Sequence, residues 1–142
     1  MNTNLQIPAS PLCSALGLEV IGLRCSGRPR AHRLRASRGV SESRRLHPGR
    51  IITAMLDDCM GPAVWFHSCG HNYSVTVGMN VNFLRAARLG RIVGEAQVLQ
   101  LGKTIGFVEG RLFDAEHHLL AHATASVRLV AAARLAVADA SV

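Results

Sequence analysis

A strict alternation between Tyr73 and Phe83 is the feature that most constrains how this chain folds. Apolar side chains occupy every second position in this stretch, and small or polar residues stand between them. Successive side chains of a strand point to opposite faces of a sheet, so a period of two predicts a strand with one buried face. A second alternation, from Leu119 to Leu129, predicts another such strand. A sheet of these strands has to cover its apolar face with a further element.

Two more strands are predicted between these alternating stretches. Residues Arg91 to Leu101 and Lys103 to Asp114 flank Gly102, which suits a tight hairpin connection. The polar residues Asp114 to His117 then form a second turn that leads into the last strand. Because the strands are consecutive and their connections are short, we expect mostly antiparallel pairing.

The element that covers this sheet is predicted between Arg50 and Phe66, where the apolar spacing becomes helical. Two rows at i, i+4 spacing make a broad apolar face, consisting of Ile51, Met55 and Cys59 and of Ile52, Leu56 and Met60. Pro62 removes one backbone hydrogen bond, so a kink or an early end is expected there. One buried helix followed by four antiparallel strands predicts an α+β fold in which a sheet wraps a central helix.

The strong positive charge of the chain is local. Nine of its 16 Lys and Arg residues, and one of its nine acids, lie in residues 22–50, an atypical Arg-rich segment. This segment suits a loop, an edge strand or disorder. A weak alternation over residues 31–36 permits one short exposed strand. No aromatic side chain is present in it for base stacking, which argues against nucleic-acid binding.

Length and composition set the class of protein. The 142 residues, 49% of them hydrophobic, fit a single domain over 1–142 that needs no metal or disulfide, with residues 131–142 as a tail. Residues 51–130 contain no apolar run of about 18 residues, so no membrane span is expected. Because the first residues lack a secretory pattern, we predict a cytoplasmic location and reduced cysteines. The seven histidines show no metal-ligand spacing, and no metal is predicted.

Three motifs indicate a family. They occur in a consistent order and spacing, and they are GRIITAMLDDCMG (Gly49 to Gly61), MNVNFLRAARLG (Met79 to Gly90) and VLQLGKTIGFVEGRLFD (Val98 to Asp114). From Gly49 to Val130 the chain resembles hotdog-fold acyl-CoA thioesterases of the phenylacetate-degradation type, within the 4-hydroxybenzoyl-CoA thioesterase superfamily. The resemblance implies a hotdog fold, hydrolysis of acyl-CoA to free acid and coenzyme A, and a homodimer or homotetramer. Coenzyme A is part of the substrate, so no separate cofactor is implied.

The resemblance also implies a set of site residues. In the family, a glycine at the helix start donates its amide to the thioester oxygen, and an acid two turns later acts on the thioester or on water. These positions correspond to Gly49 and Asp57, and Thr76 matches a small hydroxyl near the acid. The substrate-binding positions implied in the same way are Arg50, Asn82, Arg85, Arg88 and Lys103. Whether the acid is a nucleophile or a general base stays open.

The chain departs from the family at the helix start. The usual pattern is His-Gly-Gly or Gln-Gly-Gly, whereas this chain has Pro48, Gly49 and Arg50. Arg50 either adds positive charge to the site or blocks it with its bulk. His47 stands one position before the family's polar residue, so we expect it to be an exposed loop residue.

The residues themselves support the same two positions. Asp57 and Asp58 lie in a helix whose neighbouring positions are mostly apolar, and burying an ionised carboxylate without a partner is costly. We therefore assign function to Asp57 and expect Asp58 to be the one that points to solvent. The free amides and the dipole of the helix N-terminus favour negative charge near Gly49, as an oxyanion requires.

Three alternatives stay open. The missing second glycine suggests a hotdog protein that binds acyl-CoA or assembles without hydrolysis. The Arg-rich segment suggests nucleic-acid binding, which is the weaker alternative because such binding usually adds aromatic stacking. Residues 22–49 also suggest a frameshift in a GC-rich gene. Translating the other reading frames tests this hypothesis, and it fails if neither frame restores a strand pattern and a Gly-Gly before Ile51.

Overall fold

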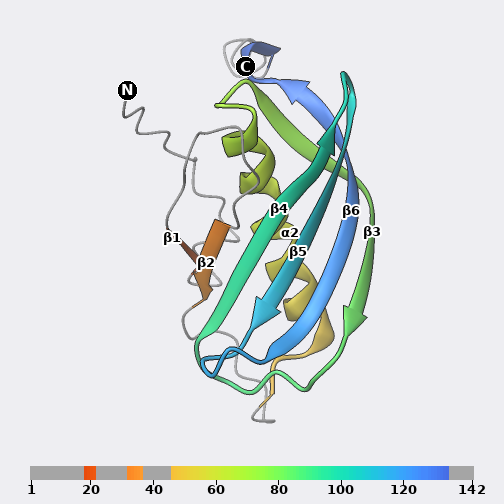
Figure 1. Cartoon of the computed structure of the whole chain (residues 1–142). Helices are drawn as coiled ribbons and strands as arrows, with labels where there is room; N and C mark the ends of the chain where they lie inside the picture. The colour runs from red at the N-terminus through yellow and green to blue at the C-terminus, as the bar shows by residue number, and fades with distance from the viewer. Residues whose placement is uncertain (1–17, 22–31, 37–45, 135–142) are drawn as a thin grey trace, which may run out of the picture.

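Within the residues that the structure describes, the fold consists of one long helix and a six-stranded sheet. The computed structural model describes residues 18–21, 32–36 and 46–134. Helix α2 spans Gly49–His67, and the strands are β1 (Leu18–Ile21), β2 (His32–Ala36), β3 (Asn72–Phe83), β4 (Ile92–Leu101), β5 (Ile105–Phe113) and β6 (Leu119–Ala131). The curved sheet lies against α2 along its length (Figure 1). The prediction of an α+β hotdog fold, with an antiparallel sheet around one central helix, is confirmed.

All strand pairs in the sheet are antiparallel, in the order β1-β2-β4-β5-β6-β3. The predicted hairpin is formed by β4 and β5, with Val98 opposite Val108. Strand β3 pairs with β6 rather than with its sequence neighbour β4, so β3 is one edge of the sheet. The opposite edge is β1, which the sequence patterns did not predict.

One short strand does form in the Arg-rich segment, as the alternation over residues 31–36 permitted. It is β2, and it pairs with β1 on one side and β4 on the other. The edge-strand alternative is therefore wrong, because β2 lies inside the sheet. The rest of the predicted segment before the helix, residues 22–31 and 37–45, lies outside the described residues.

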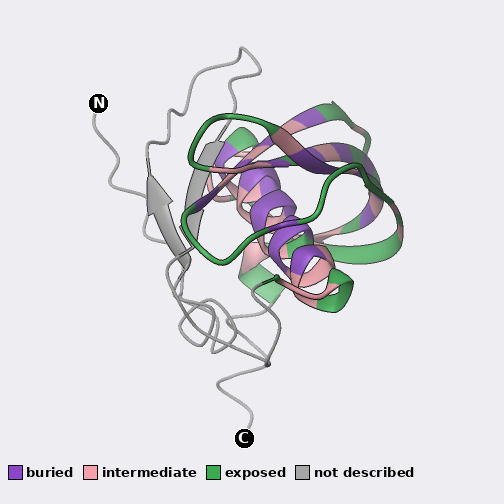
Figure 2. Cartoon of the chain, turned by 90° about the horizontal axis from the view of Figure 1, so that it is seen from below, coloured by how far each residue is buried: buried purple, intermediate pink, exposed green. Residues whose placement is uncertain are grey.

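The core lies between α2 and the concave face of the sheet. Leu56, Cys59 and Val64 of α2 are completely buried, as is Val108 of β5. Figure 2 shows buried residues along α2 and on the strands that face it. Two strand glycines allow this close approach, because a Cβ on Gly94 would lie 2.9 Å from the Cys59 Sγ and one on Gly110 would lie 3.0 Å from the Met60 Cγ.

Helix α2 continues past Pro62, so the expectation of an early end is wrong. The helix ends at His67, five residues later. Ala63, Val64 and Phe66 of this last part are all buried against the core. Their burial offsets the one backbone hydrogen bond that the proline cannot make.

Two further sequence expectations concern the membrane and the cysteines. Among the described residues, no helix is both long and apolar enough to cross a membrane. Cys59 is a free, buried thiol whose pKa is raised chiefly by burial and also by the charges of Glu95 and Asp58. Cys69 is disulfide-bonded, so the expectation of reduced cysteines is wrong at this position. That expectation was based on the predicted cellular compartment alone, and it did not consider that the fold places Cys69 in an exposed turn.

Candidate active site

The N-terminus of α2 presents an open backbone amide. Pro48 is the N-cap in an extended conformation (φ −67°, ψ 154°) and provides no side-chain cap. The amides of Ile51 and Ile52 turn back to the Pro48 carbonyl at 3.0 and 3.3 Å. Among the described residues, no backbone carbonyl accepts a hydrogen bond from the Gly49 amide, and Gly49 is exposed. The amide and the helix dipole are thus available to a negatively charged oxygen.

Asp57 and Thr76 come together although they are 19 residues apart in the sequence. The Thr76 hydroxyl donates a hydrogen bond of 2.7 Å to Oδ1 of Asp57. Thr76 pairs with Val127, which is buried under α2, so its side chain lies on the helix side of β3. Hydrogen bonds to a charged acceptor are stronger than neutral ones, and this one fixes the orientation of the carboxylate.

The relative exposure of the two adjacent acids differs from the expectation. Asp57 is exposed and Asp58 is half-buried, whereas Asp58 was expected to be the one that points to solvent. The reason is the sheet edge: Asp57 faces β3, and in the described part of the sheet no strand lies beyond β3.

Four pairs of residues lie next to each other on α2 and β3, two of them in direct side-chain interaction, and we call this line of neighbours the α2–β3 seam. Its pairs, from the start of α2 toward its end, are Gly49 with Phe83, Asp57 with Thr76, Gly61 with Ser74, and Trp65 with Tyr73. The first two pairs are exposed and the last two are half-buried. The seam is therefore open at the Gly49 end and more enclosed at the aromatic end, where the rings of Trp65 and Tyr73 stack with centroids 4.4 Å apart.

Two of the predicted substrate-binding arginines lie near the start of α2. Arg85 and Arg88 line a cavity of about 450 Å³ between the loop after β3 and the β5–β6 turn. This loop is attached to the segment before the helix, because the His47 amide donates to the Ala87 carbonyl at 2.8 Å and Leu46 forms a β-bridge with Arg88. Arg50 is exposed beside Gly49 at the same end.

The other two predicted substrate-binding residues lie elsewhere. Lys103 is in the β4–β5 turn, and the ten residues of β4 place it roughly 30 Å from the loop that carries Arg85. Figure 1 shows that turn at the opposite end of the sheet. Asn82 pairs with His122 and points to the face of the sheet turned away from α2, because the adjacent Ala121 and Ala123 are buried under the helix. Within one chain, neither residue meets Asp57.

His47 is half-buried, so the expectation of an exposed loop residue is wrong. Its backbone is fixed by the hydrogen bond to Ala87, and its Nδ1 is buried with no hydrogen-bond partner in the described part of the chain. Burial lowers the pKa of the imidazole, which favours the neutral form. No sequence pattern indicated this burial, because the contact comes from a loop 40 residues away.

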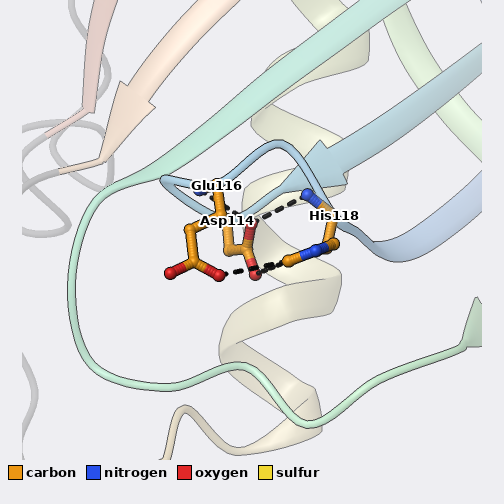
Figure 3. A network of polar contacts seen from close by, with 3 residues as sticks. All are labelled: Asp114, Glu116 and His118. Carbon is orange, nitrogen blue, oxygen red and sulfur yellow. Dashed lines mark hydrogen bonds and ion pairs between the residues drawn. The ribbon is translucent and has the colours of Figure 1, made fainter.

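Among the described residues, one cluster of possible metal ligands forms, in the β5–β6 turn (Figure 3). Ligand atoms of Asp114, Glu116 and His118 lie within 4.8 Å of one another. Oδ1 of Asp114 accepts hydrogen bonds from the amides of Glu116 and His118 at 3.0 and 2.8 Å, and Oδ2 lies 3.1 Å from the His118 Nδ1. The bond from the His118 amide is the main reason that the pKa of Asp114 is lowered. These turn hydrogen bonds account for the cluster, which the linear spacing of the histidines did not indicate.

The fold and the site match a known family. A family model for the thioesterase superfamily matches residues 45–121, which include Gly49, Asp57 and Thr76. The chain therefore belongs to the thioesterase superfamily. A search of curated proteins found no significant match.

Several solved structures share the fold. The PaaI protein of the Escherichia coli phenylacetic acid degradation operon is 16% identical, with a TM-score of 0.74 over 85% of each chain. A phenylacetic acid degradation-related protein of Ralstonia eutropha is 22% identical, with a TM-score of 0.71 over 86% of this chain and 92% of that one. A Bacillus halodurans protein solved with CoA is 22% identical, with a TM-score of 0.63 over 68% and 70%. At these identities the likeness establishes the fold.

Proposed function

We propose that this chain hydrolyses acyl-CoA thioesters to the free acid and coenzyme A. The observation that carries the proposal is the exposed Asp57 carboxylate, held by Thr76 at 2.7 Å in a chain of the thioesterase superfamily. Thioester hydrolysis needs a nucleophile or an activated water, together with a donor where charge develops on the carbonyl oxygen. Asp57 supplies the first requirement and the Gly49 amide supplies the second.

Asp57 has two possible roles in this reaction. As a nucleophile, its carboxylate attacks the thioester carbonyl and expels the coenzyme A thiolate, and water then cleaves the resulting anhydride. As a general base, it takes a proton from a water molecule that attacks the carbonyl directly. In both roles Thr76 occupies Oδ1, which leaves Oδ2 to meet the carbonyl carbon or the water. The oxyanion is stabilised by the amide at the helix N-terminus.

The spacing along α2 supports a site that is built from two chains. Gly49 and Asp57 are eight residues apart in one helix, which corresponds to about 12 Å along its axis. The oxyanion donor and the attacking group must both lie about 3 Å from the atoms of one carbonyl group. A single chain does not meet this requirement. We infer that Gly49 of one copy and Asp57 of a second copy serve the same thioester.

The β3 edge is the surface that suits this second copy. In the described sheet β3 pairs only with β6, and Val75 and Val77 on it are 55% and 65% exposed. A long exposed edge strand with apolar side chains favours pairing with another strand. If two β3 strands pair antiparallel about a two-fold axis, the two α2 helices also run antiparallel. The N-terminus of each helix then points along the other, as the composite site requires, in a homodimer or in a homotetramer of two such dimers.

Coenzyme A adds a second requirement, because it carries phosphates. Arg85 and Arg88 lie at the Gly49 end of the molecule and line a cavity large enough for part of a ligand. Guanidinium groups pair with phosphate oxygens through two parallel hydrogen bonds. We propose that these two arginines bind the nucleotide end of the substrate. The cytoplasmic location stays a prediction.

The alternative is a protein that binds acyl-CoA without hydrolysing it. It is favoured by the arginine at position 50, where the family has a second glycine. An assay of thiol release over a panel of acyl-CoA thioesters separates the two functions, with binding of the same thioesters measured by calorimetry. Hydrolysis that disappears in Asp57→Asn, with an unchanged unfolding midpoint, supports the thioesterase. Binding without hydrolysis in the wild type would show that the alternative is correct.

A further inference from the structure

The face of the sheet that is turned away from α2 carries exposed apolar side chains. Alternate residues of β5 are buried toward the helix, which turns Ile105 and Phe107 to the opposite, outer face. A β-bulge between Val98 and Gln100 adds Leu99 of β4 to the same face. The side chains of Ile105, Phe107 and Leu99 are 39, 49 and 53% exposed. We call these three residues the outer apolar patch.

The outer apolar patch borders a shallow groove on the sheet. This groove has a volume of about 370 Å³ and runs between Leu99 and Phe107 on one side and small or polar residues of β3 and β6, such as Thr124 and Ser126, on the other. Gly78 continues this low side, because a Cβ on it would lie 3.6 Å from the Ser126 Oγ. Exposed apolar side chains gathered beside a groove are typical of a surface that binds another protein.

Two opposite charges lie on either side of the outer apolar patch. Arg128 of β6 is the register partner of Ile105, and Glu109 lies four residues after Ile105 on β5. Arg128 is exposed and forms no ion pair with another described residue. Oε1 of Glu109 accepts a hydrogen bond from Arg111 at 2.8 Å, whereas Oε2 is 3.5 Å from the His122 Nε2. Oε2 therefore has capacity for a further donor.

These charges are arranged to pair with a second copy of the same surface. Phe107 lies between them, because it is two residues from Glu109 along β5 and opposite the residue two positions before Arg128 on β6. A two-fold axis that runs in the plane of the sheet over Phe107, perpendicular to the line from Arg128 to Glu109, brings each arginine to the glutamate of the other copy. The same axis places Leu99 of each copy near Ile105 of the other.

The geometry of sheets agrees with this arrangement. Strands lie roughly 4.8 Å apart and rise roughly 3.4 Å per residue, so the line from Arg128 to Glu109 is tilted by about 20° from the strands. The two-fold axis then makes the strands of the two copies cross at roughly 40°. Aligned sheets that pack face to face cross at about 30°, with side chains of both inner faces interdigitating.

We propose that the outer face of the sheet is an interface through which two copies of this chain pack back to back. Phe107 is the apolar centre of the interface, and the Arg128–Glu109 pairs lie toward its rim. This interface is separate from the β3 edge, and its axis is perpendicular to the one that relates two paired β3 strands. The two contacts together build a homotetramer. The inference does not depend on the thioesterase function, because α2 and Asp57 lie on the other side of the sheet.

The test removes the apolar contact and the charge contact separately. Phe107→Glu places a charge at the centre of the interface and should convert the tetramer into a dimer in sedimentation-velocity experiments. Arg128→Glu places two carboxylates opposite each other, so the dissociation constant of the tetramer should rise about tenfold or more. Arg134→Glu is the matched control, because it makes the same charge change at an exposed residue beyond the end of β6. This control should leave the tetramer intact.

Folding and thioester hydrolysis are measured on the same variants. Phe107→Glu should keep the circular dichroism spectrum of the wild type, because Phe107 is exposed in the single chain. If it does not fold, the comparison of Arg128→Glu with Arg134→Glu decides. A wild type that sediments as a dimer, or a tetramer that Phe107→Glu and Arg128→Glu both leave intact, would overturn the proposal, as would equal dissociation of Arg134→Glu. Dissociation as expected in a protein that hydrolyses no thioester would support this interface and overturn the thioesterase function.

Discussion

Substitution of Gly94 by alanine measures how closely α2 packs against the sheet. The new Cβ would lie 2.9 Å from the Cys59 Sγ and 3.2 Å from the Leu112 Cδ2, closer than the roughly 3.5–4.0 Å of ordinary contacts. Overpacking of this kind costs about 1–3 kcal/mol. Removal of a strand glycine returns roughly 0.5–1 kcal/mol through backbone entropy. Gly94→Ala is therefore expected to lower the free energy of unfolding by about 1–2 kcal/mol.

A double-mutant cycle with Cys59→Ala isolates the contact. Cys59 is completely buried and its raised pKa keeps the thiol neutral, so it behaves as a small apolar side chain. Cys59→Ala alone should cost about 1 kcal/mol for one buried heavy atom. In the double variant the methyl group introduced at position 94 occupies the space that the sulfur leaves, so the combined loss should be smaller than the sum by roughly 1 kcal/mol.

The assay is urea unfolding followed by circular dichroism, at one fixed protein concentration because oligomerisation shifts apparent stability. Additive losses in the two single variants would refute the close approach of Gly94 to Cys59. An increase in stability on Gly94→Ala alone would refute it as well.

Three other predictions concern the site. Thr76→Val should reduce kcat about tenfold, which is the effect of losing one hydrogen bond to Asp57. The free energy of unfolding should change by less than about 0.5 kcal/mol, because the pair is exposed. An unchanged kcat would contradict the positioning role of Thr76. Gly49→Pro removes the free amide and should abolish turnover. The substitution should not disturb the backbone, because Pro48 already has the extended conformation that a residue before a proline adopts. Gly49→Ala keeps the amide and should retain turnover. Burial lowers the pKa of His47 in the folded state below its ordinary value of 6.5. Below pH 6.5 the unfolded state therefore binds more protons than the folded state, and the free energy of unfolding should fall as the pH drops. His47→Gln should flatten this pH dependence in urea titrations.

Local patterns were sufficient for the central elements of the fold. Alternation over residues 73–83 and 119–129, and the glycine at position 102, indicated strands and a hairpin that the structure contains. Strand β1 was missed because its four residues are too few to show a period. Pro62 was given too much weight, because a local rule takes no account of the burial that stabilises the last turns of α2.

The sequence indicated some residues of the site and missed others. Asp57 and Thr76 were expected to be close from a family resemblance, and the structure brings their side chains within hydrogen-bonding distance. The burial of His47 could not be predicted, because it depends on the loop around Ala87, which is distant in the sequence.

The composite site has a direct test in mixed dimers. A chain carrying Gly49→Pro and a differently tagged chain carrying Asp57→Asn are co-expressed, and the heterodimer is purified on both tags. Each parent is expected to be inactive as a homodimer. In the heterodimer, the Gly49 amide of one chain faces the intact Asp57 of the other, so one of the two sites is complete. The heterodimer should hydrolyse acyl-CoA at about half the wild-type rate, whereas a heterodimer as inactive as both parents would contradict a site shared between two copies.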